Sequence, residues 1–216
     1  MEALIFSEIV KSFSSGLKVL NGLSATVPLK GLCFVVGKSG SGKSVLCRLA
    51  VGLLRPDAGS VELSDQRIDT LPERKLQAVR AKVPYLVQGP ALLDWLSLEA
   101  NVALASKGKQ DAARVKDAID RVGLTAFAQR FPPEVGPGIK KRTAIARALV
   151  LQPKYLLLDE PTTGLDREAA GQVNDTLELL KKQGLGAMVV SHDYKAVDRL
   201  ADLVLVVDSG KASFRS

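Results

Sequence analysis

The stretch GKSGSGKS, residues 37–44, constrains the fold of this chain more than any other part of its sequence. It follows the apolar run LCFVV (32–36), which predicts a buried strand, and it opens SVLCRLAVGLL (44–54), whose apolar spacing predicts a helix. A glycine-rich loop between a strand and a helix lets successive backbone N–H groups converge on phosphate oxygens. The stretch therefore predicts a phosphate-binding loop within an α/β fold.

The residue types in this loop suit a nucleoside triphosphate with its metal ion. The helix N-terminus favours an anion, Lys43 is placed to reach the β- and γ-phosphates, and Ser44 offers a hydroxyl to Mg²⁺. The residues that we expect around the phosphates are Gly37, Lys38, Ser39, Gly40, Ser41, Gly42, Lys43, Ser44 and Val45. A glycine-rich loop that binds nothing is the alternative, and the flanking strand and helix argue against it.

Two acidic residues follow a second apolar run, YLLLD (155–159), which predicts a buried strand. Asp159 ends this strand at the sheet edge where ligands bind in open α/β folds, and it suits the Mg²⁺ shell. Glu160 comes next and is expected to point the other way along the pleat, where it could take the proton of an attacking water. An ordinary acidic strand end is the alternative, which the upstream phosphate loop disfavours.

Two further polar residues follow predicted strands. Gln88 ends the strand that begins with VPYLV (83–87), and its amide could touch both Mg²⁺ and the attacking water. His192, the only histidine, comes after GAMVVS (186–191). A lone histidine is more often structural than catalytic, but this position at the ligand edge favours contact with the γ-phosphate or the attacking water.

The order of elements predicts an α/β fold with a mostly parallel sheet and an antiparallel β part near the N-terminus. We expect one domain over residues 1–216, with a core formed by 1–88 and 153–216. The region from about 89 to 152 has helical spacing throughout and is expected to be a helical insertion.

Composition narrows the possible partners only slightly. The net charge of +7 favours anionic partners, but such an excess is usually a solvated surface. Cys33 and Cys47 lie in predicted core elements and are expected to be reduced thiols. The N-terminus lacks the basic start of a signal peptide, and no apolar run is long enough to span a bilayer. A role at a membrane would therefore need another chain to supply the span.

Taken together and in this order, the motifs resemble those of the ATP-binding subunit of ABC transporters, over nearly the whole chain. In that family the loop 37–44 corresponds to Walker A, Gln88 to the Q-loop and YLLLDE to Walker B with its catalytic glutamate. TGLD (163–166) is similar to the D-loop, and His192 to the switch histidine. The resemblance implies a P-loop NTPase core, ATP and Mg²⁺ as cofactors, and ATP hydrolysis coupled to transmembrane transport.

Phe13 is similar to the aromatic residue of the A-loop, which stacks on adenine in this family. A phenylalanine packed in the core is an equally good alternative for this position.

The stretch EVGPGIKKRTAIARAL (134–149) resembles the signature motif and its helix, but it departs from the family pattern L-S-G-G-Q. Gly136 stands where the family has serine, so a hydroxyl donor to the opposite γ-phosphate is missing. Pro137 replaces the first glycine and removes one N–H, although proline is tolerated in the first helical turn. Gly138 remains, and the helix N-terminus can still attract phosphate.

The resemblance implies two kinds of partner. Family members dimerise head to tail, so that each nucleotide touches Walker A of one subunit and the signature motif of the other. The second ATPase subunit is either another copy of this chain, with two weakened sites, or a different chain with a better signature. Transmembrane permease subunits are the other implied partners, which places the protein in the cytoplasm on the inner face of the membrane. No nucleic acid partner is expected.

The segment after Gln88, GPALLDWLSLEANVAL, corresponds to the part of the family that contacts the permease. We expect Trp95 or Leu93 at that interface, with packing inside the helical insertion as the alternative. The cargo is poorly encoded. KKR (140–142) resembles the ATPases of Mla-type phospholipid transport, unless it is only a basic helix face, whereas LLDWLSL (92–98) resembles importers of small organic anions.

Two rival functions are weighed against transport. A soluble ABC-type ATPase acting on DNA or ribosomes is disfavoured, because the chain has one nucleotide domain and no coiled-coil insertion. A P-loop kinase for small molecules is disfavoured by Glu160 directly after Asp159, by the D-loop and by the position of His192.

Overall fold

A computed structural model describes residues 2–13, 16–106 and 111–215 of the chain. Within these ranges the strands form two sheets. The four-stranded sheet is antiparallel and has the order β2-β1-β4-β5, and the six-stranded sheet has the order β10-β9-β3-β8-β7-β6. The strands are β1 (Ala3–Ser12), β2 (Lys18–Pro28), β3 (Leu32–Val36), β4 (Ala58–Leu63), β5 (Gln66–Arg67), β6 (Tyr85–Leu86), β7 (Tyr155–Asp159), β8 (Gly186–Val190), β9 (Leu203–Asp208) and β10 (Lys211–Arg215).

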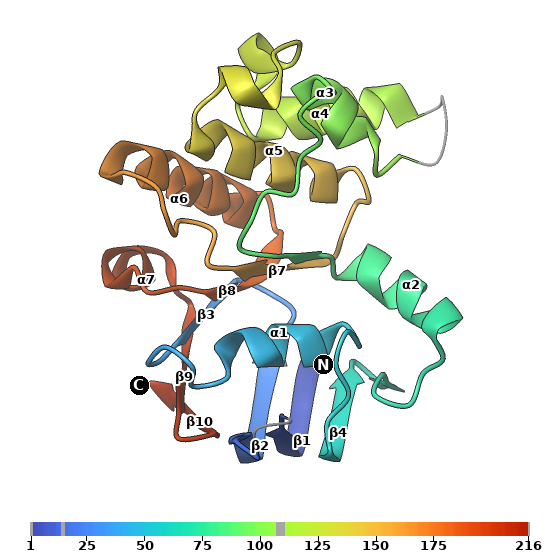
Figure 1. The fold of residues 1–216 in the computed structure, drawn as a ribbon, viewed down its shortest axis with the longest axis vertical. Helices are drawn as coiled ribbons and strands as arrows, with labels where there is room; N and C mark the ends of the chain where they lie inside the picture. Colours follow the sequence, from blue (N-terminus) through green and yellow to red (C-terminus); the bar gives the residue numbers. More distant parts are fainter. Residues whose placement is uncertain (1, 14–15, 107–110, 216) are drawn as a thin grey trace.

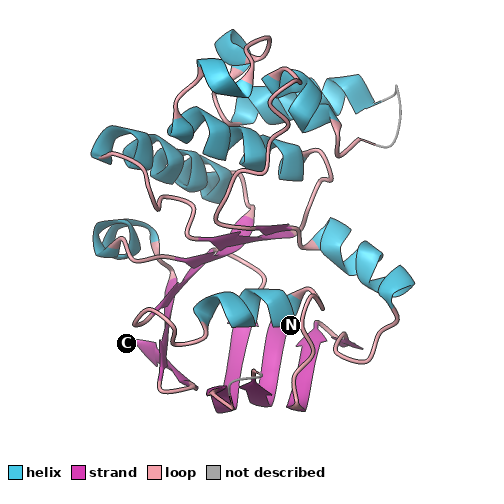
Figure 2. Ribbon diagram, in the orientation of Figure 1, coloured by secondary structure: helices cyan, strands magenta, loops and turns pink. Residues whose placement is uncertain are grey.

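The helices lie in layers around these sheets (Figures 1 and 2). They are α1 (Lys43–Ala50), α2 (Glu73–Lys82), α3 (Leu98–Ala103), α4 (Ala112–Arg121), α5 (Pro137–Leu149), α6 (Arg167–Lys182) and α7 (Tyr194–Leu200), with short 3-10 helices at Thr125–Phe127 and Pro132–Glu134. Helix α1 lies between the two sheets, and α3, α4 and α5 gather at the end of the molecule farthest from the four-stranded sheet. Helix α6 packs against α5.

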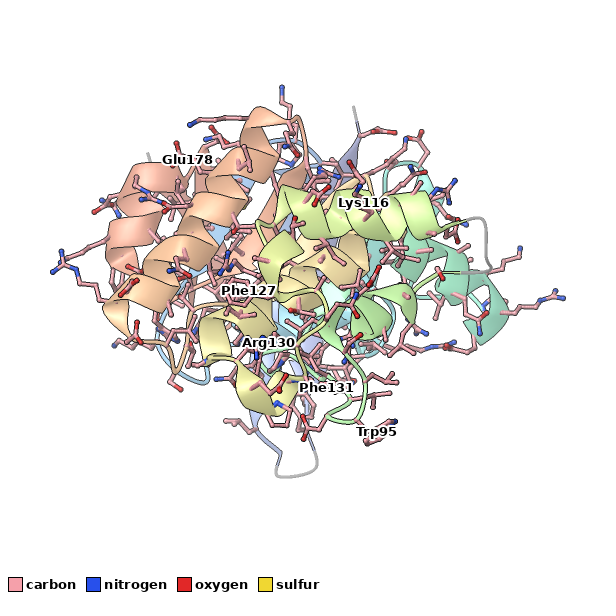
Figure 3. All side chains as sticks on the ribbon, turned by 90° about the horizontal axis from the view of Figure 1, so that it is seen from above. Trp95, Lys116, Phe127, Arg130, Phe131 and Glu178 are labelled. Carbon is pink, nitrogen blue, oxygen red and sulfur yellow. The ribbon has the colours of Figure 1, made fainter. Side chains whose placement is uncertain are left out.

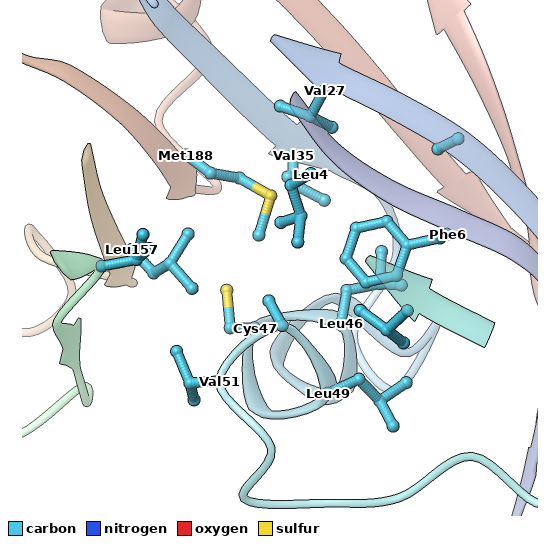
Figure 4. Close-up of a cluster of buried hydrophobic side chains, with 14 of the residues drawn as sticks. Leu4, Phe6, Val27, Val35, Leu46, Cys47, Leu49, Val51, Leu157 and Met188 are labelled. Carbon is cyan, nitrogen blue, oxygen red and sulfur yellow. The ribbon is translucent and has the colours of Figure 1, made fainter. Parts of the chain in front are cut away.

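Apart from Asp159 at the end of β7, the central strands of the six-stranded sheet have no charged residue, because they are buried on both faces. In β7, Tyr155 and Leu157 face one core, and Leu156 and Leu158 face the other, as the two-residue period of a strand requires. The first core surrounds α1 and includes Cys47, which packs near Leu157 and Met188 (Figure 4). The second core lies under α3–α7.

The predicted fold class is confirmed: β3, β6, β7, β8 and β9 run parallel, and the N-terminal sheet is antiparallel. Cys33 and Cys47 are buried free thiols, as expected. The division into a core and a helical insertion stays a prediction.

Two local expectations were wrong, and one helix was missed. The helix predicted over 44–54 ends at Ala50, because Gly52 adopts a φ of +66° that ends the helical path. The strand predicted over 83–87 is only Tyr85–Leu86, so Gln88 lies beyond the end of that strand. Helix α2 was not expected, although Pro72 before it and Glu73 in its first turn are typical of a helix start.

Candidate functional site

The loop between β3 and α1 closes around the ammonium group of Lys43. Its Nζ donates hydrogen bonds to the carbonyl oxygens of Gly37, at 3.0 Å, and of Lys38, at 2.8 Å. Glycine is required at position 37, since a Cβ there would lie 2.1 Å from the carbonyl oxygen of Val207. Gly42 has a φ of +104°, which other residues rarely adopt. The sequence pattern therefore folds into a loop that bends sharply in front of α1.

This loop has the polar groups that a phosphate needs. No side chain caps the N-terminus of α1, so the N–H groups of its first turn face away from the helix without a side-chain acceptor. The hydroxyl of Ser41 is buried and has no hydrogen-bond partner among the described residues. Burial lowers the pKa of Lys43, and the carboxylates of Glu160 and Asp159 act in the opposite direction. An anionic ligand at this loop would pair with the ammonium of Lys43 and with the N–H groups of the first turn of α1.

Asp159 lies at the end of β7 and accepts hydrogen bonds at both carboxylate oxygens. Ser44 donates from Oγ to Oδ1 at 2.8 Å, and Tyr85 donates from its hydroxyl to Oδ2 at 2.7 Å. Burial, helped by the bond to Asp159, raises the pKa of Tyr85 far above its ordinary value, so this hydroxyl keeps its proton. The aspartate is thereby fixed next to the phosphate loop.

The pair formed by Ser44 and Asp159 suits a magnesium ion, because both supply hard oxygen ligands. Among the described residues, no group of three or more acidic, histidine or cysteine side chains is arranged to hold a metal ion.

Glu160 gathers three polar neighbours around its carboxylate. Its Oε2 accepts hydrogen bonds from Gln88 Nε2 at 3.1 Å and from Thr163 Oγ1 at 3.0 Å. Its Oε1 lies 3.3 Å from Nε2 of His192. The structure thus brings Gln88, Glu160 and His192 together beside the phosphate loop, at the edge where β7 and β8 end.

The backbone at Glu160 differs from the sequence expectation. Strand β7 ends at Asp159, and Glu160 has a φ of +50° instead of continuing the pleat. Its N–H donates to the carbonyl oxygen of Val190 at 2.9 Å, which ties this turn to β8. The direction of the Glu160 side chain therefore comes from a strained turn and not from strand alternation.

Two neighbours of the site were missed by the sequence analysis. Tyr85 pairs with Leu157 across β6 and β7. A tyrosine in the strand next to the one that ends in Asp159 could have been recognised in the sequence as a neighbour of that aspartate. Thr163 lies three residues after Glu160, which is the spacing of a short turn. Gln88 contacts Glu160 and not the pair Ser44–Asp159, so its predicted role as a metal ligand stays a prediction.

The signature-like residues begin α5. Gly136 is the N-cap and Pro137 the first residue of the helix, as expected for proline in the first turn. Gly136 and Pro137 are exposed, and a Cβ at Gly136 would meet no atom within 4 Å. Gly138 is buried, and a Cβ there would lie 2.9 Å from the Cβ of Ala169 on α6. Gly138 is therefore needed for helix packing, whereas Gly136 is not.

The exposed aromatic residues include two that the sequence singled out. Phe13 is 40% exposed, with the ammonium of Lys11 5.8 Å from its ring centroid, so the core alternative is wrong and stacking on adenine stays a prediction. Trp95 is 73% exposed and projects from the loop after β6, while Leu93 is half-buried (Figure 3).

Comparisons with a family model, with curated proteins and with solved structures all point to the same family. The family model described as "ABC transporter" matches residues 20–163. The methionine import ATP-binding protein MetN of Mesorhizobium japonicum is 37% identical over 198 residues, covering 89% of this chain and 54% of the relative. The same protein of Caulobacter vibrioides is 36% identical, covering 96% and 65%. The chain thus spans only about half to two thirds of the length of these relatives.

A relative of similar length is the cell division ATP-binding protein FtsE of Bacillus subtilis, which is 31% identical over 94% of this chain and 91% of its own. Among solved structures, cbiO1 of Clostridium perfringens, part of the ABC transporter complex cbiONQ, has a TM-score of 0.90 and 26% identity over 99% of this chain and 88% of its own. An ATP-binding cassette bound to ADP and Pi has a TM-score of 0.85 at 24% identity, over 99% of both chains, and so supports the fold alone.

The expected resemblance to an ATPase family is confirmed by these matches. The family match covers more than half of the chain, and the phosphate loop, Asp159 and Glu160 lie inside it. The chain belongs to the ABC transporter family of ATP-binding proteins.

Proposed function

We propose that this chain binds and hydrolyses ATP to power an ABC transporter. The observation that carries the proposal is the carboxylate of Glu160, which Gln88, Thr163 and His192 surround beside the phosphate loop. A carboxylate next to a phosphate site is suited to accept the proton of an attacking water.

Each residue has a role in this scheme. The loop 37–45 and Lys43 would bind the phosphates, and Ser44 and Asp159 would hold Mg²⁺, which supplies positive charge to the phosphate oxygens. Glu160 would orient and deprotonate the water. The side chains of Gln88 and His192 now contact Glu160, and both would turn toward the γ-phosphate when ATP enters.

The test is release of phosphate from ATP by the purified chain, alone and with its membrane partner. Activity that requires Mg²⁺ and is lost in Lys43→Ala supports the proposal. ATP binding without any turnover under either condition would reject the hydrolytic role.

The active assembly is proposed to contain two ATPase chains, with α5 of each directed at the nucleotide of the other. Because Gly136 and Pro137 lack the hydroxyl and one N–H of the family pattern, this chain would complete a partner's site poorly. A homodimer would have two such sites, whereas a heterodimer with a better signature would have one. Complete inactivity of the chain and its permease without a second ATPase would exclude the homodimer.

A permease contact is proposed on the surface that follows Gln88. Trp95 is exposed there, and residues 84–87 and 89–91 line a groove of about 350 Å³ together with Ala144, Arg147 and Ala148 of α5. Among the described helices, none is long and apolar enough to cross a membrane. A permease would supply that span and hold the chain at the inner face of the membrane. Trp95→Asp should abolish co-purification with the permease, and normal assembly of that variant would refute the contact.

For the cargo, we favour import of a small polar solute. The alternative from the sequence was an importer of a small organic anion. Two relatives at 36–37% identity are named for methionine import, which favours an importer over a phospholipid transporter. The phospholipid cargo suggested by residues 140–142 gains no support from these relatives. Uptake of radiolabelled amino acids by cells with and without the gene would test the choice, and equal uptake by both would contradict it.

A second candidate is an ATPase of cell division that moves no cargo. The match to FtsE favours it, since that relative is covered over 91% of its length. Loss of the gene should then give a division defect with normal solute uptake, whereas the transport proposal expects the reverse.

A further inference from the structure

Lys141 is the one lysine of α5 that reaches from the helical part of the described structure to the hydrolytic residues. Its Nζ donates hydrogen bonds to the carbonyl oxygens of Gln88 and of Glu160, the second at 3.4 Å. These carbonyls belong to the two residues whose side chains bond to each other. The ammonium of Lys141 therefore binds the backbone of both residues.

The backbone at Glu160 needs such support. A φ of +50° is unfavourable for a residue with a side chain and persists only when its surroundings hold it. The N–H of Glu160 is held by Val190, and its carbonyl accepts from Lys141 and from the N–H of Thr163 at 3.3 Å. The carbonyl of Gln88 lies beyond the end of β6, where no strand partner can fix it through a sheet ladder.

Two opposing influences act on the charge of the Lys141 amine, and burial is the larger of them. Lys141 is half-buried, and burial lowers its pKa, but the carboxylates of Glu160 and Asp159 oppose that effect. Lys141 also lies one turn after Gly138, on the helix whose first residues are Gly136 and Pro137. A shift of α5 would therefore be passed directly to Gln88 and Glu160.

We propose that Lys141 is a positioning residue, which sets the mutual geometry of Gln88 and Glu160 according to the position of α5. The inference rests on the proposed function, because it concerns Gln88 and Glu160, the two residues that we propose to act in ATP hydrolysis. Lys141 itself touches only backbone carbonyls and would act through the two side chains that it positions.

Hydrogen exchange in the nucleotide-free chain tests this inference without any need for turnover. In Lys141→Met, the amides of Glu160 and Thr163 should exchange about tenfold faster, because one charged hydrogen-bond donor is lost. Lys141→Arg, which keeps the charge and the donors, should restore most of the protection. Lys116→Met, on the exposed side of α4, is the matched control and should exchange like the wild type.

Turnover then separates positioning from a general loss of structure. For Lys141→Met we expect kcat to fall by about 10- to 100-fold while KM for ATP changes by less than about twofold. Unchanged exchange at Glu160 and Thr163 would overturn the inference, and so would equal loosening of distant β9 and β10. If the wild type hydrolyses no ATP, the proposed function fails, yet the exchange result still decides whether Lys141 positions this pair.

Discussion

The two parts of this molecule that would meet phosphate are built in opposite ways. In the core, the ammonium of Lys43 donates to two carbonyl oxygens of the phosphate loop. Asp159 accepts hydrogen bonds at both carboxylate oxygens, from Ser44 and from Tyr85. At the start of α5, Gly136 and Pro137 are exposed and contribute only backbone. The core thus holds the groups that we propose to act on ATP, whereas the surface that would complete another nucleotide site offers few donors.

The largest effect should come from the core. Glu160→Gln removes the proton acceptor and keeps the shape of the side chain, so we expect ATP turnover to fall by about 10²- to 10⁴-fold. Affinity for ATP, measured with a fluorescent analogue, should stay near the wild-type value, because Lys43 and the loop are untouched. Turnover at half the wild-type rate or above would show that Glu160 is not the proton acceptor, and the contrast between the core and the start of α5 would be refuted.

The second effect should come from α5. Restoring the family pattern with Gly136→Ser and Pro137→Gly adds a hydroxyl and an N–H, and we expect turnover to rise by about tenfold or more. The change is sterically open, since a Cβ at position 136 meets no atom within 4 Å. Equal turnover of the double variant and the wild type would show that the altered motif does not limit hydrolysis.

Gly138→Ala tests whether the buried glycine at the start of α5 stabilises the fold, which the exposed Gly136 is not expected to do. The added Cβ would lie 2.9 Å from the Cβ of Ala169, so α5 and α6 must move apart. We expect a loss of about 1–3 kcal/mol in the free energy of unfolding, measured by chemical denaturation. Gly136→Ala is the matched control and should change stability by less than about 0.5 kcal/mol. Equal stability of the two variants would show that Gly138 is not a packing residue.

The sequence predicted the core part far better than the details that support it. The spacing of the phosphate loop and the apolar strand before Asp159 depend on local pattern, so both were visible without coordinates. The expected meeting of Gln88, Glu160 and His192 at one sheet edge followed from strand order. The contact of Lys141 with two carbonyls depends on how α5 sits against β6 and β7, and no local pattern encodes that placement.

Strain and packing were also hidden from the sequence. The positive φ of Glu160 depends on the turn between β7 and α6, and simple alternation predicted a continued pleat instead. Gly138 was interpreted as a remnant of a phosphate motif, yet its burial against Ala169 gives it a packing role that the sequence could not show. A glycine at the start of a helix can serve either ligand binding or helix packing, and only a structure distinguishes the two roles.

The smallest effect that we predict concerns the support of Asp159. Tyr85→Phe removes one of the two hydrogen bonds to this buried carboxylate and leaves the bond from Ser44. A hydrogen bond from an outer residue orients a metal-ligating carboxylate, so losing it weakens the metal site, and because the bond from Ser44 remains we expect the Mg²⁺ concentration for half-maximal ATP turnover to rise only about threefold to tenfold. Mn²⁺ binding followed by electron paramagnetic resonance should weaken in parallel. Tyr194→Phe, at a tyrosine that is 57% exposed on α7, is the control. If Tyr85→Phe and Tyr194→Phe behave alike, the hydrogen bonds of the core do not tune the metal site, and the core is less preorganised than its contacts indicate.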